Sequence, residues 1–230
     1  MSEFTTYKEE ENYSIIELNN GKVNAISNEV IDEINIHLDT VEKAEKVLIL
    51  TGKEGVFSAG YDLKTMTKSP ESAKELITKG SQLSLRRLSF PMPIITASTG
   101  HALAKGAFLL LSADYRLGTE GDFKIGFNEV MIGMTMHHAG ITIAKARLAP
   151  VYFERSINNS EIFNPKDATN AGFLDKVVPA SHLLPTAIKI AKMFSKLNKK
   201  AHKETKLKLR KLYLEDLQKA IELDKTDLFK

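Results

Sequence analysis

Residues 13–50 alternate between two kinds of hydrophobic spacing, and this alternation constrains the fold more than any other feature of the chain. Residues 13–18 and 47–50 are short apolar runs typical of buried strands. Between them, apolar side chains recur with the helical period after Ser27, a residue type that favours helix N-caps. A strand, a helix and a strand in this order predict an α/β fold.

The rest of the chain continues this pattern and ends in helices. Patterning predicts helices over residues 71–88, 106–113, 138–148 and from 165 to Gly172. It predicts strands over residues 94–98, 114–117 and 123–127. From residue 181 it predicts two or three amphipathic helices. We therefore expect an α/β core over residues 1–180 and a helical region over residues 181–230 that belongs to the same structural unit.

Composition narrows the class of protein. The chain has 230 residues, of which 43% are hydrophobic and 27% charged, which suits one globular unit. The absence of cysteine excludes disulfides, thiolate zinc sites and a cysteine nucleophile. No apolar run approaches the length of a membrane span, and the N-terminus is acidic, so we expect a soluble, cytoplasmic protein without a membrane partner.

Positive charge is concentrated near the C-terminus. Residues 189–211 contain ten Lys or Arg and one acid, although the net charge of the whole chain is only +3. This segregation favours a polyanionic partner or, alternatively, a solvated helix face. No aromatic-interleaved RNA-binding motif accompanies the charge, so we do not expect a nucleic-acid partner.

Two segments place small residues between a strand and a helix, namely residues 58–62 and 100–106. Backbone N–H groups at such junctions are left unpaired and can hold an anion or a developing oxyanion. In their order and spacing, these segments and their surroundings resemble the crotonase superfamily, the enoyl-CoA hydratase/isomerase family, over residues 12–210. The matching segments are residues 24–27, 50–52, 57–64, 93–97, 100–103, 114–116, 126–130 and 171–178.

The resemblance implies a fold and a ligand. The fold is a crotonase-like spiral of ββα units, followed by a helical C-terminal region that joins subunits into a homotrimer or a hexamer made of two trimers. The ligand is an acyl-coenzyme A thioester. No metal or redox cofactor is implied, because the thioester itself is the electron sink.

The resemblance also assigns roles to residues. The thioester oxygen would lie between the backbone N–H groups of Tyr61 and Lys105, and Glu129 would be the catalytic carboxylate. Coenzyme A would contact the backbone of Ser58, Ala59 and Gly60 and the side chains of Lys64 and Lys206. Phe108, His137 and His138 would line the acyl pocket.

The proposed chemistry follows from one missing carboxylate. Hydratases of this family use two glutamates, and Phe108 occupies the position of the first. A single glutamate suits the transfer of a proton better than the addition of water, so we expect a Δ3,Δ2-enoyl-CoA isomerase. In that reaction Glu129 would take a proton from C2 and return it to C4.

Two alternatives stay open. In a hydratase, another group would have to orient the water, and His137 and His138 are the candidates. Adjacent residues rarely face the same way, so at most one of them should point inward. In a different class of protein, Phe108 and the Ala104-Lys105 pair that replaces two glycines of the family would belong to a non-catalytic acyl-CoA binder.

Overall fold

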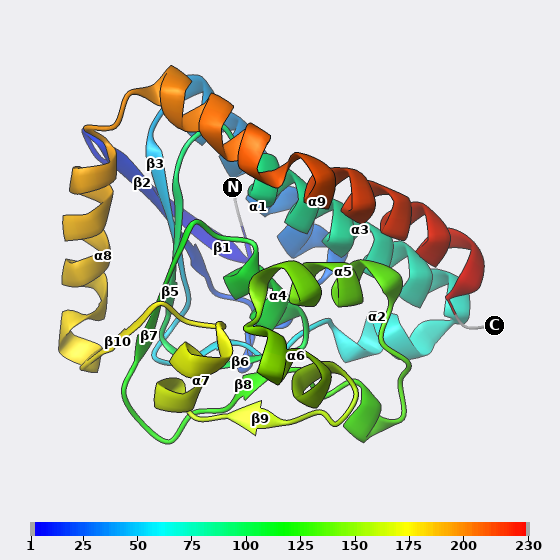
Figure 1. The fold of residues 1–230 in the computed structure, drawn as a ribbon. Helices are drawn as coiled ribbons and strands as arrows, with labels where there is room; N and C mark the ends of the chain where they lie inside the picture. Colours follow the sequence, from blue (N-terminus) through cyan, green and yellow to red (C-terminus); the bar gives the residue numbers. More distant parts are fainter. Residues whose placement is uncertain (1–2, 229–230) are drawn as a thin grey trace.

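The computed structural model describes residues 3–228, and its strands form two sheets (Figure 1). The six-stranded sheet has the order β1-β2-β3-β5-β7-β10, and the four-stranded sheet has the order β4-β6-β8-β9. The strands are β1 (Thr5–Glu9), β2 (Tyr13–Leu18), β3 (Val47–Thr51), β4 (Gly55–Ser58), β5 (Ile94–Ser98), β6 (Gly100–Leu103), β7 (Tyr115–Thr119), β8 (Ile125–Gly126), β9 (Ile162–Phe163) and β10 (Lys176–Val178).

The helices fill the connections between strands and the C-terminal region. They are α1 (Asn28–Ala44), α2 (Leu63–Lys68), α3 (Pro70–Ser89), α4 (Lys105–Leu111), the 3₁₀ turn η1 (Val130–Ile132), α5 (His138–Arg147), α6 (Pro150–Ile157), α7 (Pro165–Ala171), α8 (Ala180–Phe194) and α9 (Lys199–Asp227). None of the helices within residues 3–228 combines the length and apolar character that crossing a membrane requires.

Successive strands alternate between the two sheets. β3, β5 and β7 pair in parallel in the larger sheet, while β4, β6 and β8 pair in parallel in the smaller one. Each turn of the chain therefore adds one strand to each sheet before a helix or loop returns it. This repeat is the expected spiral of ββα units, and the α/β prediction is confirmed.

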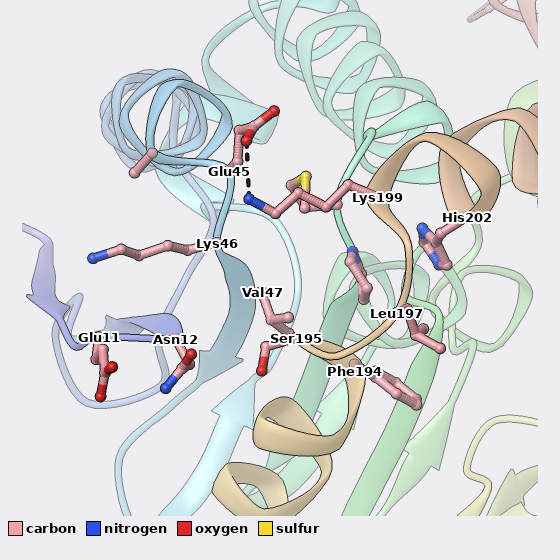
Figure 2. A pocket seen from close by; sticks show the side chains of 13 residues that line it. Glu11, Asn12, Glu45, Lys46, Val47, Phe194, Ser195, Leu197, Lys199 and His202 are labelled. Carbon is pink, nitrogen blue, oxygen red and sulfur yellow. Dashed lines mark hydrogen bonds and ion pairs between the residues drawn. The ribbon is translucent and has the colours of Figure 1, made fainter.

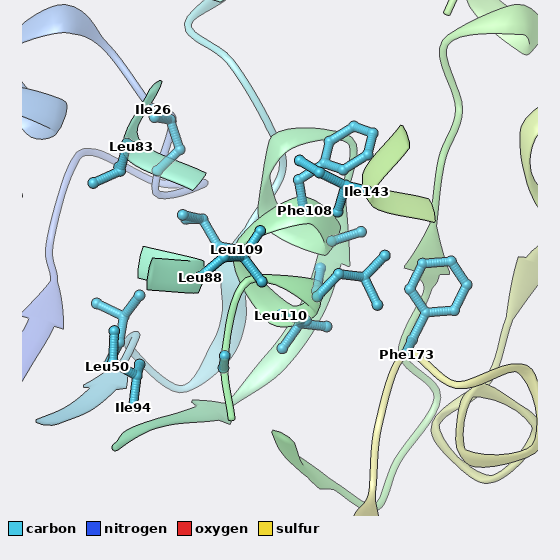
Figure 3. Close-up of a cluster of buried hydrophobic side chains, with 14 of the residues drawn as sticks. Ile26, Leu50, Leu83, Leu88, Ile94, Phe108, Leu109, Leu110, Ile143 and Phe173 are labelled. Atoms are coloured by element: carbon cyan, nitrogen blue, oxygen red, sulfur yellow. The ribbon is translucent and has the colours of Figure 1, made fainter. Parts of the chain in front are cut away.

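The larger sheet is buried on both faces. Every residue of β3 and β5 is buried, which explains their continuous apolar sequence. One face packs on α8 through Ala187 and Ala191, and the opposite face meets the main core. Within that core, Figure 3 shows Leu109 and Leu110 of α4 surrounded by side chains from several elements.

α9 follows α8, crosses the molecule and packs along α3 and α5 (Figure 1). Asn198 caps its first turn by accepting a hydrogen bond from the Ala201 N–H at 2.9 Å. The expected helical region is therefore two helices, α8 and α9. The predicted division at residue 180 coincides with the start of α8, which nevertheless packs directly on the sheet.

Several local predictions differ from the structure. The strand expected over residues 123–127 is reduced to Ile125–Gly126. The segment before residue 13 contains β1, which pairs antiparallel with β2. The two small-residue junctions also include parts of short strands, because β4 and β6 run into them before the chain turns toward α2 and α4. Ser27 is the N-cap of α1, as predicted.

Candidate functional site

The first junction presents the Tyr61 N–H away from its neighbouring strand segment. Ile26 donates to the Gly60 carbonyl at 2.8 Å, and its own carbonyl accepts from the Asp62 N–H at 3.0 Å. Because backbone groups alternate in extended chain, the intervening Tyr61 N–H must point to the other side. Within residues 3–228 it has no acceptor. It is therefore available to a ligand.

Ser58 fixes the shape of this junction. Its hydroxyl donates to the Asn24 carbonyl at 2.8 Å and accepts from the Gly60 N–H at 3.2 Å. The Ser58 side chain is fully buried, whereas Ala59 is exposed. Any contact of this junction with a ligand would therefore use its backbone and Ala59, not the serine hydroxyl.

The second junction brings a second N–H to the same place. The Ala104 N–H donates to the Gly126 carbonyl at 3.0 Å, and Lys105 then begins α4. The Lys105 N–H lies in the first turn of the helix and has no acceptor in the described part of the chain. A Cβ atom added to Gly60 would lie 3.6 Å from the Lys105 nitrogen, so the two junctions touch.

Ala104 has a conformation that suits glycine. Its φ of 48° and ψ of −119° lie in a region that side chains with a Cβ atom rarely adopt. Ala104→Gly should therefore raise the free energy of unfolding by about 1 kcal/mol, the strain relieved less the added entropy of the unfolded chain. Urea denaturation measures this difference, and an equal or lower stability would contradict the strain.

Glu129 lies between β8 and η1 with its carboxylate in the interior. The residue is 8% exposed, and its Oε2 has no hydrogen-bond partner within the described residues. Burial raises the pKa of Glu129 to about 7. Burial, and secondarily the negative charge of Glu129, raise the pKa of the Tyr61 hydroxyl.

Aromatic side chains pack together at position 108 and at Phe127, two residues before Glu129. Phe108 of α4 is 1% exposed and stacks on Phe127, with ring centroids 4.3 Å apart. Its ring also meets the edge of His137 at 5.4 Å. No carboxylate stands at position 108, and the stack fills the position with apolar surface.

The two histidines differ in exposure. His137 is buried, whereas the His138 side chain is half-exposed and lies 4.0 Å from Asp227. Burial lowers the pKa of His137 to about 3, with smaller contributions from the charges of Lys105 and His138. His137 is consequently a neutral imidazole at physiological pH.

Asp224 of α9, which the sequence did not single out, anchors the segment that carries these histidines. Its carboxylate accepts the backbone N–H groups of His138 and Ala139 at 2.7 and 2.9 Å. The α5 N-terminus is thereby capped by a residue 86 positions away, beside a cavity of about 260 Å³ that His137 also lines. Sequence patterning gives no signal for such a distant cap.

The two lysines expected at coenzyme A differ in their surroundings. Lys64 on α2 is exposed. Lys206 is instead buried, and its ammonium donates to the carbonyls of Phe90 and Met92 and to the Asp114 carboxylate at 2.6–3.0 Å. All three ammonium protons are used, so this lysine ties α9 to the core. The expected coenzyme A contact of Lys206 stays a prediction.

A separate cavity of about 150 Å³ lies at the amino ends of β2, β3 and β5 (Figure 2). Asn12 and Val47 line it, and Lys199 at its rim forms an ion pair with Glu45 at 2.9 Å. None of the residues that line it belongs to the candidate site. Across residues 3–228, no group of three His, Asp or Glu side chains is arranged to hold a metal ion.

Comparison with known proteins adds the family. The model for enoyl-CoA hydratase/isomerase matches residues 8–230. The chain belongs to this family. It is accordingly an enzyme of the crotonase superfamily, and the resemblance seen in its motifs is confirmed.

This chain is similar to family members named as isomerases and to others named as hydratases. A crystal structure of a family protein from Pseudomonas syringae is 52% identical, covers 98% of both chains and has a TM-score of 0.97. Enoyl-CoA delta isomerase 1 of Mus musculus is 28% identical over 92% of this chain and 75% of its own length. A probable enoyl-CoA hydratase of Bacillus subtilis is 31% identical over 70% of this chain and 64% of its own length.

Proposed function

We propose that this enzyme is a Δ3,Δ2-enoyl-CoA isomerase. The observation that carries the proposal is the buried carboxylate of Glu129 together with the aromatic stack that takes the place of a second carboxylate at position 108. A hydratase of the expected kind needs a second carboxylate to hold water, and Phe108 supplies only apolar surface. A single carboxylate with an unpartnered oxygen is suited to carry one proton between two carbons of the same substrate.

In the proposed reaction, the thioester oxygen accepts hydrogen bonds from the N–H groups of Tyr61 and Lys105. Glu129 removes a proton from C2, and the electron pair of that C–H bond moves toward the thioester to give an enolate. The two N–H groups stabilise the negative oxygen. Glu129 then returns the proton to C4 while the double bond moves from C3–C4 to C2–C3, so no atom is gained or lost.

The same proposal places coenzyme A along the first junction. The backbone of Ser58, Ala59 and Gly60 would contact the adenine ring, and this part of the junction offers backbone and the exposed Ala59. The exposed ammonium of Lys64, on the helix that follows, would approach the phosphates. Lys206 would have to give up its ion pair with Asp114 to contact coenzyme A in this arrangement.

Hydration is the second candidate function. The position of the buried His137 imidazole favours it. Its neutral imidazole contacts Phe108 and could orient a water molecule in place of the missing carboxylate. The similarity to a probable hydratase agrees with either reaction.

One assay separates these functions. Purified protein is incubated with 3-enoyl-CoA and, separately, with 2-enoyl-CoA of several chain lengths. The isomerase should convert 3-enoyl-CoA to 2-enoyl-CoA without net hydration. Formation of 3-hydroxyacyl-CoA alone would favour the hydratase, whereas binding of acyl-CoA without any turnover would favour a binder.

The pH dependence of kcat/KM should report Glu129. The base must be ionised, so activity is present above its pKa of about 7 and is lost as the pH falls through that value. We expect a roughly tenfold loss per pH unit below that point. Initial rates between pH 5 and 9 measure this limb, and a midpoint near the ordinary glutamate pKa would contradict the buried base.

We also propose a homotrimer, built through the C-terminal helices. Leu209 and Leu212 of α9 are 81% and 74% exposed, which leaves large apolar side chains without cover in a single chain. Light scattering of the purified protein should give three times the 25.6 kDa chain mass. A monomeric mass at micromolar concentration would contradict this assembly.

A further inference from the structure

The side chain of Lys105 carries a charge that the proposed mechanism has not used. The residue is 2% exposed, and its ammonium donates to the Ser84 hydroxyl at 2.7 Å and to the Gly80 carbonyl. Both partners are neutral groups of α3. No carboxylate lies within ion-pair distance of Lys105 among residues 3–228. The ammonium is therefore buried without a counter-charge.

The Lys105 ammonium lies close to both residues whose N–H groups are the proposed oxyanion donors. The ammonium belongs to the residue that provides one donor, so one lysine side chain separates the two groups. It also lies 5.9 Å from the ring centroid of Tyr61, the residue that provides the other. The Tyr61 hydroxyl is directed toward α3 as well, with the Ile77 carbonyl 3.5 Å away.

A buried charge without a partner is unfavourable in the resting protein. Burial, and secondarily the positive charge of Arg87, lower the pKa of Lys105 well below its ordinary value, so its protonated form depends on a negative charge nearby. A purely structural contact between α4 and α3 would be served as well by an apolar side chain of the same length. A negative charge that forms nearby during the reaction would offset the cost, and the enolate oxygen is such a charge.

We propose that the Lys105 side chain, protonated in the substrate complex, supplies a positive charge close to the two donor residues, which stabilises the enolate more than the bound substrate. This inference rests on the proposed function and makes Lys105 a positioning residue through its side chain, in addition to its backbone N–H. Because the charge acts mainly on the intermediate, its effect should appear in kcat more than in KM.

The test compares wild type with Lys105→Met, Lys105→Gln and, as a matched control, Lys79→Met. Lys79 is on the same helix α3 as the partners of Lys105, but its ammonium is partly exposed and pairs with Asp32. Lys105→Met keeps the length of the side chain without its charge. Lys105→Gln also lacks the charge but can still donate a hydrogen bond toward α3.

Two readouts are measured on each folded variant. The first is kcat and KM with 3-enoyl-CoA. The second is the infrared stretch of the thioester carbonyl of bound hexanoyl-CoA, which reports polarisation without turnover. Loss of one unit charge close to the donor residues predicts a loss in kcat of between about 10-fold and 100-fold for both Lys105 variants. KM should change by less than about threefold, and the carbonyl stretch should move toward its value in free solution.

Three results would overturn the inference. Lys105→Met with wild-type kcat and carbonyl frequency would remove any role for the charge. Recovery of kcat in Lys105→Gln alone would show that anchoring to α3 suffices. If the wild type itself neither isomerised 3-enoyl-CoA nor shifted the carbonyl frequency, the proposed function would fail first and this inference with it. In the first two results the wild type is active, so they would overturn this inference and leave the proposed function standing.

Discussion

Glu129→Gln should lower kcat for the isomerisation of a 3-enoyl-CoA by about 10³-fold, with KM changed little. Glutamine keeps the size of the side chain and a carbonyl oxygen, so the pocket retains its shape. It cannot accept the C2 proton, and no second carboxylate stands at position 108 to replace it. The absorbance of the conjugated 2-enoyl thioester measures the rate directly.

The matched control for this prediction is Glu154→Gln on α6. Glu154 is exposed, and its replacement should leave kcat unchanged. Calorimetric titration with hexanoyl-CoA should show that Glu129→Gln still binds the thioester. If the variant retained more than about a tenth of wild-type turnover, Glu129 would not be the base, and His137 would become the first residue to replace.

The elements with clear hydrophobic periods were predicted well from the sequence. The helix after Ser27 and the apolar run of α4 follow directly from local patterning. The short strands β4 and β6 do not, because their apolar residues are interrupted by Gly, Ser and His and their pairing partners are about 45 residues away. Strand pairing over such distances is decided by the packing of the whole spiral.

The candidate site could be predicted in part. The positions of the two backbone donors and of the carboxylate follow from motif spacing, because those roles depend on where the chain turns. The role of a long side chain does not follow in this way. Lys105 and Lys206 are both lysines in a basic protein, yet the first is bonded only to neutral groups and the second to a carboxylate 92 positions away.

Asp114 is the carboxylate that binds the Lys206 ammonium. Its replacement should be the most destabilising change outside the site. It forms ion pairs with Lys206 at 2.6 Å and Arg210 at 2.9 Å, and its Oδ2 also accepts the Ile94 N–H at 2.8 Å. All three charged side chains are largely shielded from solvent. Removing one member of such a cluster leaves the others buried without compensation.

Asp114→Ala should therefore lower the free energy of unfolding by about 4 kcal/mol, measured by urea denaturation. Asp216→Ala on α9 is the matched control, because Asp216 and its partner Lys219 are exposed and 3.8 Å apart, and its loss should change stability by less than about 0.5 kcal/mol. Since Asp224 on the same helix caps α5 beside His137, weaker docking of α9 should also lower turnover. Equal stabilities of the two variants would show that α9 is held by its apolar contacts alone.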